Sequence, residues 1–193
     1  MEQLRKQRIG IIGGNGLGKS TFLKTLVGQI PPLGGEAAFG YQVDIGYFDQ
    51  QMAQYNSNKT VLDDFWDEYP TLDRTEVRSS LGAFMFSQEE VFKNVNMLSG
   101  GEKVRCMLSR MMLSGANVVL LDQPTNHLDM ESIQAVNKGL EAFPGVVLLA
   151  SHDHEMLTST CNRVIAFQPD GTIIDKYGTY DDYLAWMAQN KQQ

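Results

Sequence analysis

Residues 13–20 have the types and the spacing that hold a phosphate group. They read Gly-Gly-Asn-Gly-Leu-Gly-Lys-Ser, which matches the pattern G-x-x-x-x-G-K-[ST], and they follow a short apolar run at residues 9–12. The glycines allow backbone N–H groups to turn toward an anion, and the helix that begins near Lys19 directs its positive end at the same point. Lys19 can reach the β- and γ-phosphate oxygens, and the Ser20 hydroxyl can bind Mg²⁺. The residues expected to contact a nucleotide are Gly13, Gly14, Asn15, Gly16, Leu17, Gly18, Lys19, Ser20 and Thr21.

Asp122 ends a second apolar run, residues 118–121, far downstream of the first motif. A carboxylate in that position can hold the water shell of Mg²⁺, which makes it the second half of a P-loop nucleoside triphosphatase site. A buried aspartate that only caps a helix is the alternative, and the glycine-rich motif disfavours it. The two motifs together predict a site for a nucleoside triphosphate and Mg²⁺.

A third motif, Leu98-Ser99-Gly100-Gly101-Glu102, places a serine three residues before a glutamate. This is the spacing of a capping box, so the motif predicts the start of a helix, and its glycines would let an anion approach the helix end closely. Taken alone, the motif is equally well explained as a plain helix cap. Combined with residues 13–20 and Asp122, it resembles the signature sequence of the ABC ATPases.

The resemblance to the ABC ATPases implies a site that two domains share. In that family the signature sequence of one domain closes over the γ-phosphate of the ATP held by the P-loop of another, so that two nucleotides lie between two domains. The implied cofactors are ATP and Mg²⁺, and the implied partner is a second ABC ATPase domain, in a homodimer or as a tandem partner. The signature residues expected at the nucleotide are Ser99, Gly100, Gly101 and Glu102.

The same resemblance assigns roles to single residues outside these motifs. Gln50 matches the Q-loop glutamine that reaches Mg²⁺ and the attacking water, and His152 matches the switch histidine that contacts the γ-phosphate. Asp129 matches the D-loop aspartate, which couples the two domains across the dimer. The resemblance places it among the nucleotide-binding residues. The implied ligands of Mg²⁺ are Ser20, Gln50 and Asp122.

Gln123 is where the chain departs from the family pattern, because the residue after the strand aspartate is usually a glutamate that acts as general base. The amide can hydrogen-bond the attacking water but cannot accept its proton. Loss of a positioned general base lowers the rate by ~10²–10⁴-fold, while binding contacts remain. A naturally degenerate site and a substitution introduced to trap the ATP-bound dimer both explain Gln123, and the otherwise complete site favours the second. If the glutamine is native, the chain would be an ATP sensor that does not hydrolyse. The catalytic positions are Gln123, His152 and Gln50.

Further segments narrow the resemblance to the ABC-F family, which comprises cytosolic proteins with tandem ATPase domains that act on ribosomes. The segments are residues 98–103, 124–129 and 177–184, and residues 84–88 and 130–133 resemble the second ATPase domain of a YbiT-like member. The resemblance implies a cytoplasmic protein that contacts the ribosome, its rRNA or tRNA, through the parent protein, with no direct membrane contact. The alternative is the ATPase subunit of a membrane transporter.

Strands and helices alternate along the chain, and this order predicts an α/β fold with a mainly parallel sheet flanked by helices. The predicted strands are residues 9–12, 43–48, 118–121, 146–150, 163–167 and 172–175, and the predicted helices are residues 19–27, 99–114, 131–143, 154–161 and 180–189. A mostly helical stretch, residues 60–97, interrupts the alternation and is expected to be an inserted subdomain, with Thr60 and Ser87 as N-caps.

Residues 1–193 are thus expected to form one P-loop domain of the ABC ATPase type. Such domains normally begin with antiparallel strands that carry an aromatic residue for stacking on adenine. Because the glycine-rich motif already starts at residue 13, the chain is expected to lack these strands.

Composition limits the other functions that are open to the chain. Its residues are 42% hydrophobic and 20% charged, as in an ordinary folded domain, and no apolar run approaches the roughly 18–20 residues that span a bilayer. The net charge is −7 without any basic run, which disfavours direct nucleic-acid binding by the chain's own surface. Cys106 and Cys161 lie far apart without metal-ligand spacing and are expected to be buried, reduced thiols.

Overall fold

The computed structural model describes residues 6–49, 51–126 and 128–190, and these residues divide into two compact units. The first, the sheet unit, comprises residues 6–47, 117–123 and 144–190. The second, the helical unit, comprises the described residues of 48–116 and 124–143. The predicted single domain and the predicted bounds of its subdomain, residues 60–97, stay predictions.

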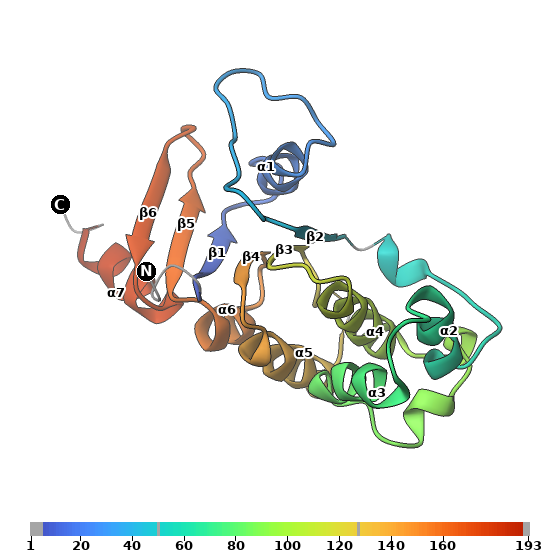
Figure 1. The fold of residues 1–193 in the computed structure, drawn as a ribbon. Coiled ribbons are helices and arrows are strands. Elements are labelled where there is room, and N and C mark those ends of the chain that lie inside the picture. The colour runs from blue at the N-terminus through green and yellow to red at the C-terminus, as the bar shows by residue number, and fades with distance from the viewer. Residues whose placement is uncertain (1–5, 50, 127, 191–193) are drawn as a thin grey trace. The chain divides into compact units, whose positions relative to one another are not determined.

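The sheet has six strands in the order β2-β3-β4-β1-β5-β6 (Figure 1). Its strands and the helices of its unit are β1 (Arg8–Ile12), α1 (Lys19–Leu26), β2 (Ile45–Phe48), β3 (Val118–Asp122), β4 (Val146–Ala150), α6 (His154–Thr160), β5 (Arg163–Phe167), β6 (Ile173–Tyr177) and α7 (Tyr180–Asn190). β1 pairs in parallel with β4 and β5, and β3 pairs in parallel with β4, whereas β5 and β6 form an antiparallel hairpin. The predicted α/β fold with a mainly parallel sheet is confirmed.

Helices cover both faces of this sheet, as successive residues of β1 show. Successive side chains of a strand point to opposite faces. Ile11 packs in one apolar cluster with Leu23 of α1, whereas a Cβ on Gly10 would lie 2.9 Å from the Sγ of Cys161, the residue that ends α6. Both cysteines are free and buried as expected, and burial raises the pKa of the Cys106 and Cys161 thiols to about 12.

The helical unit contains four α-helices and three short 3₁₀ helices within the described residues (Figure 1). They are η2 (Met52–Gln54), α2 (Val61–Glu68), α3 (Arg74–Ala83), η3 (Glu90–Phe92), η4 (Val95–Met97), α4 (Gly100–Leu113) and α5 (Met130–Ala142). An apolar core of its own holds the unit together, and it includes Phe65, Leu81, Phe86, Val91 and Cys106. Among the helices that the structure describes, none has both the length and the apolar character needed to cross a bilayer.

The two N-caps predicted in this unit have different outcomes: Thr60 caps α2, whereas η3, the helix after Ser87, has Glu89 as its N-cap. Thr60 caps α2, since its Oγ1 accepts a hydrogen bond from the Asp63 N–H at 3.1 Å. Ser87 and Glu90 form the expected reciprocal pair, with distances of 2.6 and 3.2 Å. Only the 3₁₀ turn η3 follows them, because Lys93 is extended (ψ 145°) and its carbonyl accepts a hydrogen bond from the first residue of α2 at 3.0 Å. This hydrogen bond joins segments that lie far apart in the sequence, so the spacing of neighbouring residues does not predict it.

Gly139 allows α5 to pack closely against Phe84, the residue at the C-terminal end of α3. A Cβ on Gly139 would lie 2.0 Å from the ring of Phe84, which is 1% exposed and has no room to withdraw. Gly82, in contrast, is an exposed residue of α3 with nothing within 4 Å of the position of a Cβ. The two glycines therefore differ in physical role although both lie in helices.

Gly139→Ala is expected to lower the free energy of unfolding by about 1–3 kcal/mol, because the added methyl group overpacks the Phe84 contact. Gly82→Ala is the matched control and is expected to raise it by up to ~1 kcal/mol, since alanine loses less backbone entropy in a helix. Urea-induced unfolding measures both changes. Equal effects of the two substitutions would contradict the packing role of Gly139.

Candidate functional site

The glycine-rich loop between β1 and α1 forms a small cavity in the sheet unit. The cavity measures about 170 Å³. Its lining residues are Asn15, Gly16, Gly18, Lys19, Ser20, Thr21 and Gln123. Gly16 and Gly18 adopt φ values of 78° and 94°, which L side chains rarely adopt, and Gly18 precedes α1 without a side-chain cap. The first N–H groups of α1 are thus left without a capping side chain, as an anion site requires.

Lys19 holds the loop together from inside. Its side chain is largely buried, and Nζ donates hydrogen bonds to the carbonyl oxygens of Gly13 and Gly14 at 2.8 and 2.9 Å. Burial lowers the pKa of Lys19, and the charge of Asp122 partly opposes this shift. A buried cation with two neutral partners is well suited to attract a polyphosphate.

Gly13 has a structural reason of its own to be glycine. Its φ is 145°, and a Cβ would lie 2.8 Å from the carbonyl oxygen of Phe167 in β5. The loop therefore leaves the sheet through a gap that only glycine fits. Leu17, also predicted at the nucleotide, instead lies beside this backbone, since its Cδ1 would be 3.5 Å from a Cβ on Gly13 or Gly14.

The register of the parallel strands brings three predicted segments to one edge of the sheet. Ala150 of β4 is the register partner of both Ile11 in β1 and Asp122 in β3. The glycine-rich loop, Gln123 and His152 follow these three strands, so all of them start from neighbouring carboxyl ends. Ligands bind at this edge of open α/β sheets.

Asp122 has the surroundings expected of an indirect cation ligand. The residue is 8% exposed, and its Oδ1 is buried without a hydrogen-bond donor among the described residues. Within the same residues, no three histidine, cysteine or carboxylate side chains gather as a metal site. Mg²⁺ keeps several waters and takes one or two carboxylates beside phosphate oxygens. The Asp122 carboxylate therefore fits Mg²⁺ that arrives with a nucleotide.

Gln123 turns sharply out of β3 into the cavity. Its N–H still donates to the carbonyl oxygen of Ala150 at 2.8 Å, but its φ is 51°, in the left-handed region. Non-glycine residues are uncommon in this region and often mark a functional position. The backbone thus places the side chain of Gln123 at the cavity that Lys19 and Ser20 also line.

His152 lies in the exposed turn between β4 and α6. Asp153 fixes this turn, because its carboxylate accepts the N–H of Met156 at 2.8 Å and its own N–H donates to Ser151 Oγ at 3.0 Å. Burial lowers the pKa of His152, and the positive charge of Lys19 lowers it further. The imidazole therefore lies within electrostatic reach of the glycine-rich loop.

The signature motif lies in the helical unit and begins α4 as predicted. Ser99 Oγ accepts the N–H of Glu102 at 3.3 Å, and Glu102 Oε2 accepts the N–H of Ser99 at 2.7 Å, which confirms the capping box. A Cβ on Gly101 would lie 2.0 Å from the Oγ of Ser132 in α5, whereas a Cβ on Gly100 would meet nothing within 4 Å. Gly101 thus serves helix packing, and only Gly100 leaves open space for an anion.

Asp129 caps α5, which sequence reasoning missed. Its Oδ1 accepts the N–H of Ser132 at 2.8 Å, and this hydrogen bond lowers the pKa of Asp129. The signal was present, because an aspartate three residues before a serine and ahead of a helical pattern is a typical N-cap. The predicted Gln50 lies outside the described residues.

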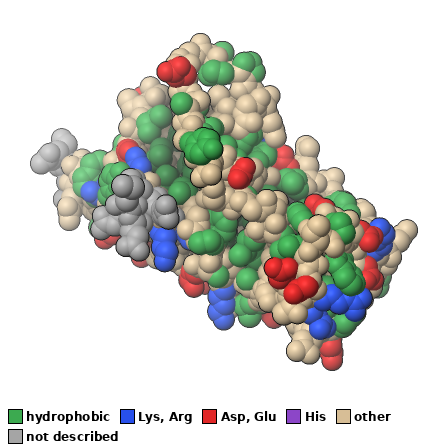
Figure 2. Space-filling view, viewed as in Figure 1, with side chains coloured by type: hydrophobic (Ala, Val, Ile, Leu, Met, Phe, Trp, Pro, Cys, Tyr) green, Lys and Arg blue, Asp and Glu red, His purple; other side chains and the backbone are tan. Residues whose placement is uncertain are grey.

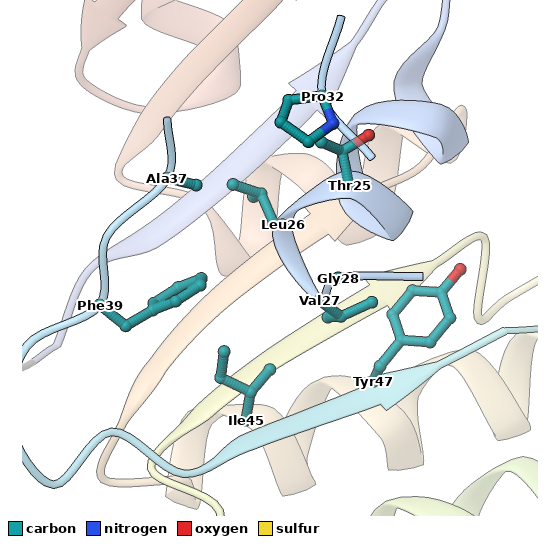
Figure 3. Close-up of a pocket in the computed structure, with 9 residues that line it drawn as sticks. All are labelled: Thr25, Leu26, Val27, Gly28, Pro32, Ala37, Phe39, Ile45 and Tyr47. Atoms are coloured by element: carbon teal, nitrogen blue, oxygen red, sulfur yellow. The ribbon is translucent and has the colours of Figure 1, made fainter. Parts of the chain in front are cut away.

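A larger cavity of about 430 Å³ lies elsewhere in the sheet unit, between the end of α1 and β2 (Figure 3). Leu26, Val27, Phe39 and Ile45 make its wall mainly apolar. None of the predicted site residues lines it, so the cavity at Lys19 remains the candidate site.

Over the helical unit, acidic and basic side chains are interspersed on the face shown in Figure 2.

The family model described as ABC transporter matches residues 2–126, which include the glycine-rich loop, the signature motif and Asp122. The chain belongs to this family. It is therefore an ABC ATPase, and ABC ATPase domains bind ATP. The roles that the resemblance assigns to single residues stay predictions.

Curated relatives match almost all of this chain but only part of their own length. The putative ATP-binding protein YdiF of Bacillus subtilis (strain 168) is 43% identical over 180 residues, which are 93% of this chain and 28% of the relative. The probable ATP-binding protein YbiT of Escherichia coli O157:H7 is 38% identical over 180 residues, 92% of this chain and 34% of the relative. The chain spans about a third of the length of these relatives.

Solved structures share the fold. The dimeric structure of MJ0796, a bacterial ABC transporter cassette, superposes with a TM-score of 0.70 at 21% identity and covers 90% of this chain and 86% of its own. A model of ribosome-bound archaeal Pelota and ABCE1 superposes with a TM-score of 0.72 at 25% identity and covers 96% of this chain and 32% of its own. ABC cassettes thus dimerise, and one neighbour of this fold is described on the ribosome.

Lys19→Met is expected to raise the pKa of His152, because it removes the nearby positive charge that disfavours the imidazolium. NMR titration of the imidazole protons measures this pKa, and a His152→Gln variant assigns the signal. Lys24→Met is the control and should leave the pKa in place, since Lys24 is in the last turn of α1 and is not among the charges that shift His152. An unchanged pKa in Lys19→Met would contradict the proximity of the two residues.

Proposed function

We propose that the chain is one ATPase domain of an ABC-F protein, that it binds Mg-ATP at an interface with a second ABC ATPase domain, and that Gln123 arrests it before hydrolysis. The observation that carries the proposal is the cavity of about 170 Å³ in which Gln123 joins Lys19 and Ser20. The phosphate cradle is complete, but the residue placed to prepare water is an amide.

The residues of the cradle would divide the work of binding. The N–H groups at the start of α1 and the ammonium of Lys19 would bind the β- and γ-phosphates, while Ser20 and Asp122 would hold Mg²⁺. Mg²⁺, when bound with ATP, neutralises phosphate charge. His152 contacts the γ-phosphate from the turn after β4 and donates an N–H to it.

The signature motif would complete the site of a partner domain. Gly100 leaves space at the start of α4, where the helix N-terminus attracts an anion. ATP then joins two domains because each nucleotide contacts the cradle of one domain and the signature of the other. Gln50 and Asp129 complete the set, as Mg²⁺ ligand and as contact across the dimer.

Gln123 would bind the attacking water without activating it. The carboxamide oxygen accepts a hydrogen bond from water, but the neutral amide does not take up a proton at physiological pH. Nucleotide binding and domain association persist, since neither needs a base. The chain accordingly accumulates in the ATP-bound dimer.

Gln123→Glu is expected to raise the steady rate of ATP hydrolysis by ~10²–10⁴-fold, because it restores a general base at an otherwise complete site. Phosphate release measures the rate, and nucleotide titration should show little change in ATP affinity. Lys19→Met in the Gln123→Glu background is the control and should abolish both binding and turnover. No gain from Gln123→Glu would instead support a sensor that does not hydrolyse.

The ribosome is the proposed partner of the parent protein. The similarity to YbiT, the ABC-F-like motifs at residues 124–129 and 177–184, and a fold neighbour described on the ribosome support this assignment. The net charge of −7 argues that the contact with RNA is made by other parts of the parent protein.

The parent protein with Gln123 is expected to co-sediment with ribosomes in ATP and to be released in ADP, because only ATP closes the two domains. Its Lys19→Met variant should remain in the supernatant in either nucleotide. Co-purification with an integral membrane protein, without ribosome binding, would support the transporter subunit instead.

A further inference from the structure

The start of α4 combines a proposed anion site with a negative charge. Glu102 belongs to the signature motif that would face the γ-phosphate of a partner domain, yet its carboxylate lies in the first turn of the same helix. A carboxylate there offsets part of the positive potential at the N-terminus of the helix, and it also repels a phosphate. A glutamine would satisfy the capping box without this repulsion.

Lys93 forms an ion pair with the Glu102 carboxylate. Its Nζ lies 2.6 Å from Glu102 Oε1, while Oε2 accepts the N–H of Ser99 at 2.7 Å. The carboxylate side chain is only 10% exposed, so water screens it poorly, and the lysine side chain is 45% exposed. Although burial acts in the opposite direction, the hydrogen bonds from Lys93 and Ser99 lower the pKa of Glu102.

Two further cations near Glu102 in the sequence have other partners, and Lys103 donates to the Oδ1 of Asn56 at 2.8 Å. Arg105 lies 3.8 Å from Glu90 and donates to the carbonyl oxygens of Phe84 and Met85 at 3.3 and 3.1 Å. Its guanidinium also lies over the ring of Phe86. Among the described residues, Lys93 is therefore the cation that pairs with Glu102 in the structure.

We propose that Lys93 is a positioning residue for the ATP-bound dimer: its ammonium holds and neutralises the Glu102 carboxylate, so that the start of α4 retains a net attraction for the γ-phosphate held by the partner. This inference rests on the proposed function, because it needs ATP to join two domains. It predicts an effect of charge on association rather than on binding of ATP by the chain's own P-loop. An ion pair that only stabilises the fold would act differently.

The test measures ATP-dependent self-association of the chain by sedimentation equilibrium for Lys93→Met, Glu102→Gln and the double variant. Lys93→Met should weaken association by roughly three- to thirtyfold, because the carboxylate is left uncompensated. Glu102→Gln should associate as tightly as the unsubstituted chain or more tightly, because the repulsion disappears and the cation remains. The double variant should regain the association that Lys93→Met loses.

Lys59→Met is the matched control, since Lys59 pairs with Asp67 on the surface of the same unit. It should leave association unchanged. Thermal unfolding without nucleotide and ATP binding to the monomer are measured for every variant, so that a folding defect is separated from an effect on the dimer.

Two outcomes would contradict the inference. If Glu102→Gln weakens association as much as Lys93→Met, the intact ion pair matters rather than the charge balance, and the inference is wrong while the dimer function stands. If the unsubstituted chain does not associate in ATP at all, the inference fails, while the proposed function stands with a tandem domain as the partner.

Discussion

The parallel pairing of β1 with β4 and of β4 with β3 is the constraint on which the site depends. Because Ile11, Ala150 and Asp122 share one row of the register, three segments separated along the chain leave the sheet at one edge. A slip of one residue would turn every side chain of a strand to the other face. The buried apolar residues of the strands therefore hold the polar residues of the site in place.

The N-termini of α1 and α4 carry different charged residues, and each has a different proposed role in binding ATP. At the start of α1, Lys19 is buried against the neutral carbonyl oxygens of its own loop, so its charge is free to attract phosphate. At the start of α4, Glu102 closes a capping box and is paired with Lys93. One helix end thus carries an added cation, and the other carries an anion that is paired with a lysine.

Much of the fold could be predicted from local patterns. Continuous apolar runs located β3 and β4, and the Ser99–Glu102 spacing located the start of α4, because these signals depend only on neighbouring residues. The pattern at Ser87 was less informative. Its capping box is present, but pairing between Lys93 and the first residue of α2 ends the helix after one turn, and local spacing contains no record of that contact.

The sequence by itself determined the chemistry of the candidate site, because the motif at residues 13–20, Asp122 and Gln123 fix which donors, acceptors and charges are available. Only the tertiary structure decided how those groups are used. The left-handed backbone of Gln123, the contact of Gly101 with Ser132 and the pair between Lys93 and Glu102 each depend on segments that meet through packing. The physical reason is that residue type is local, whereas distance and burial arise from contacts across the whole chain.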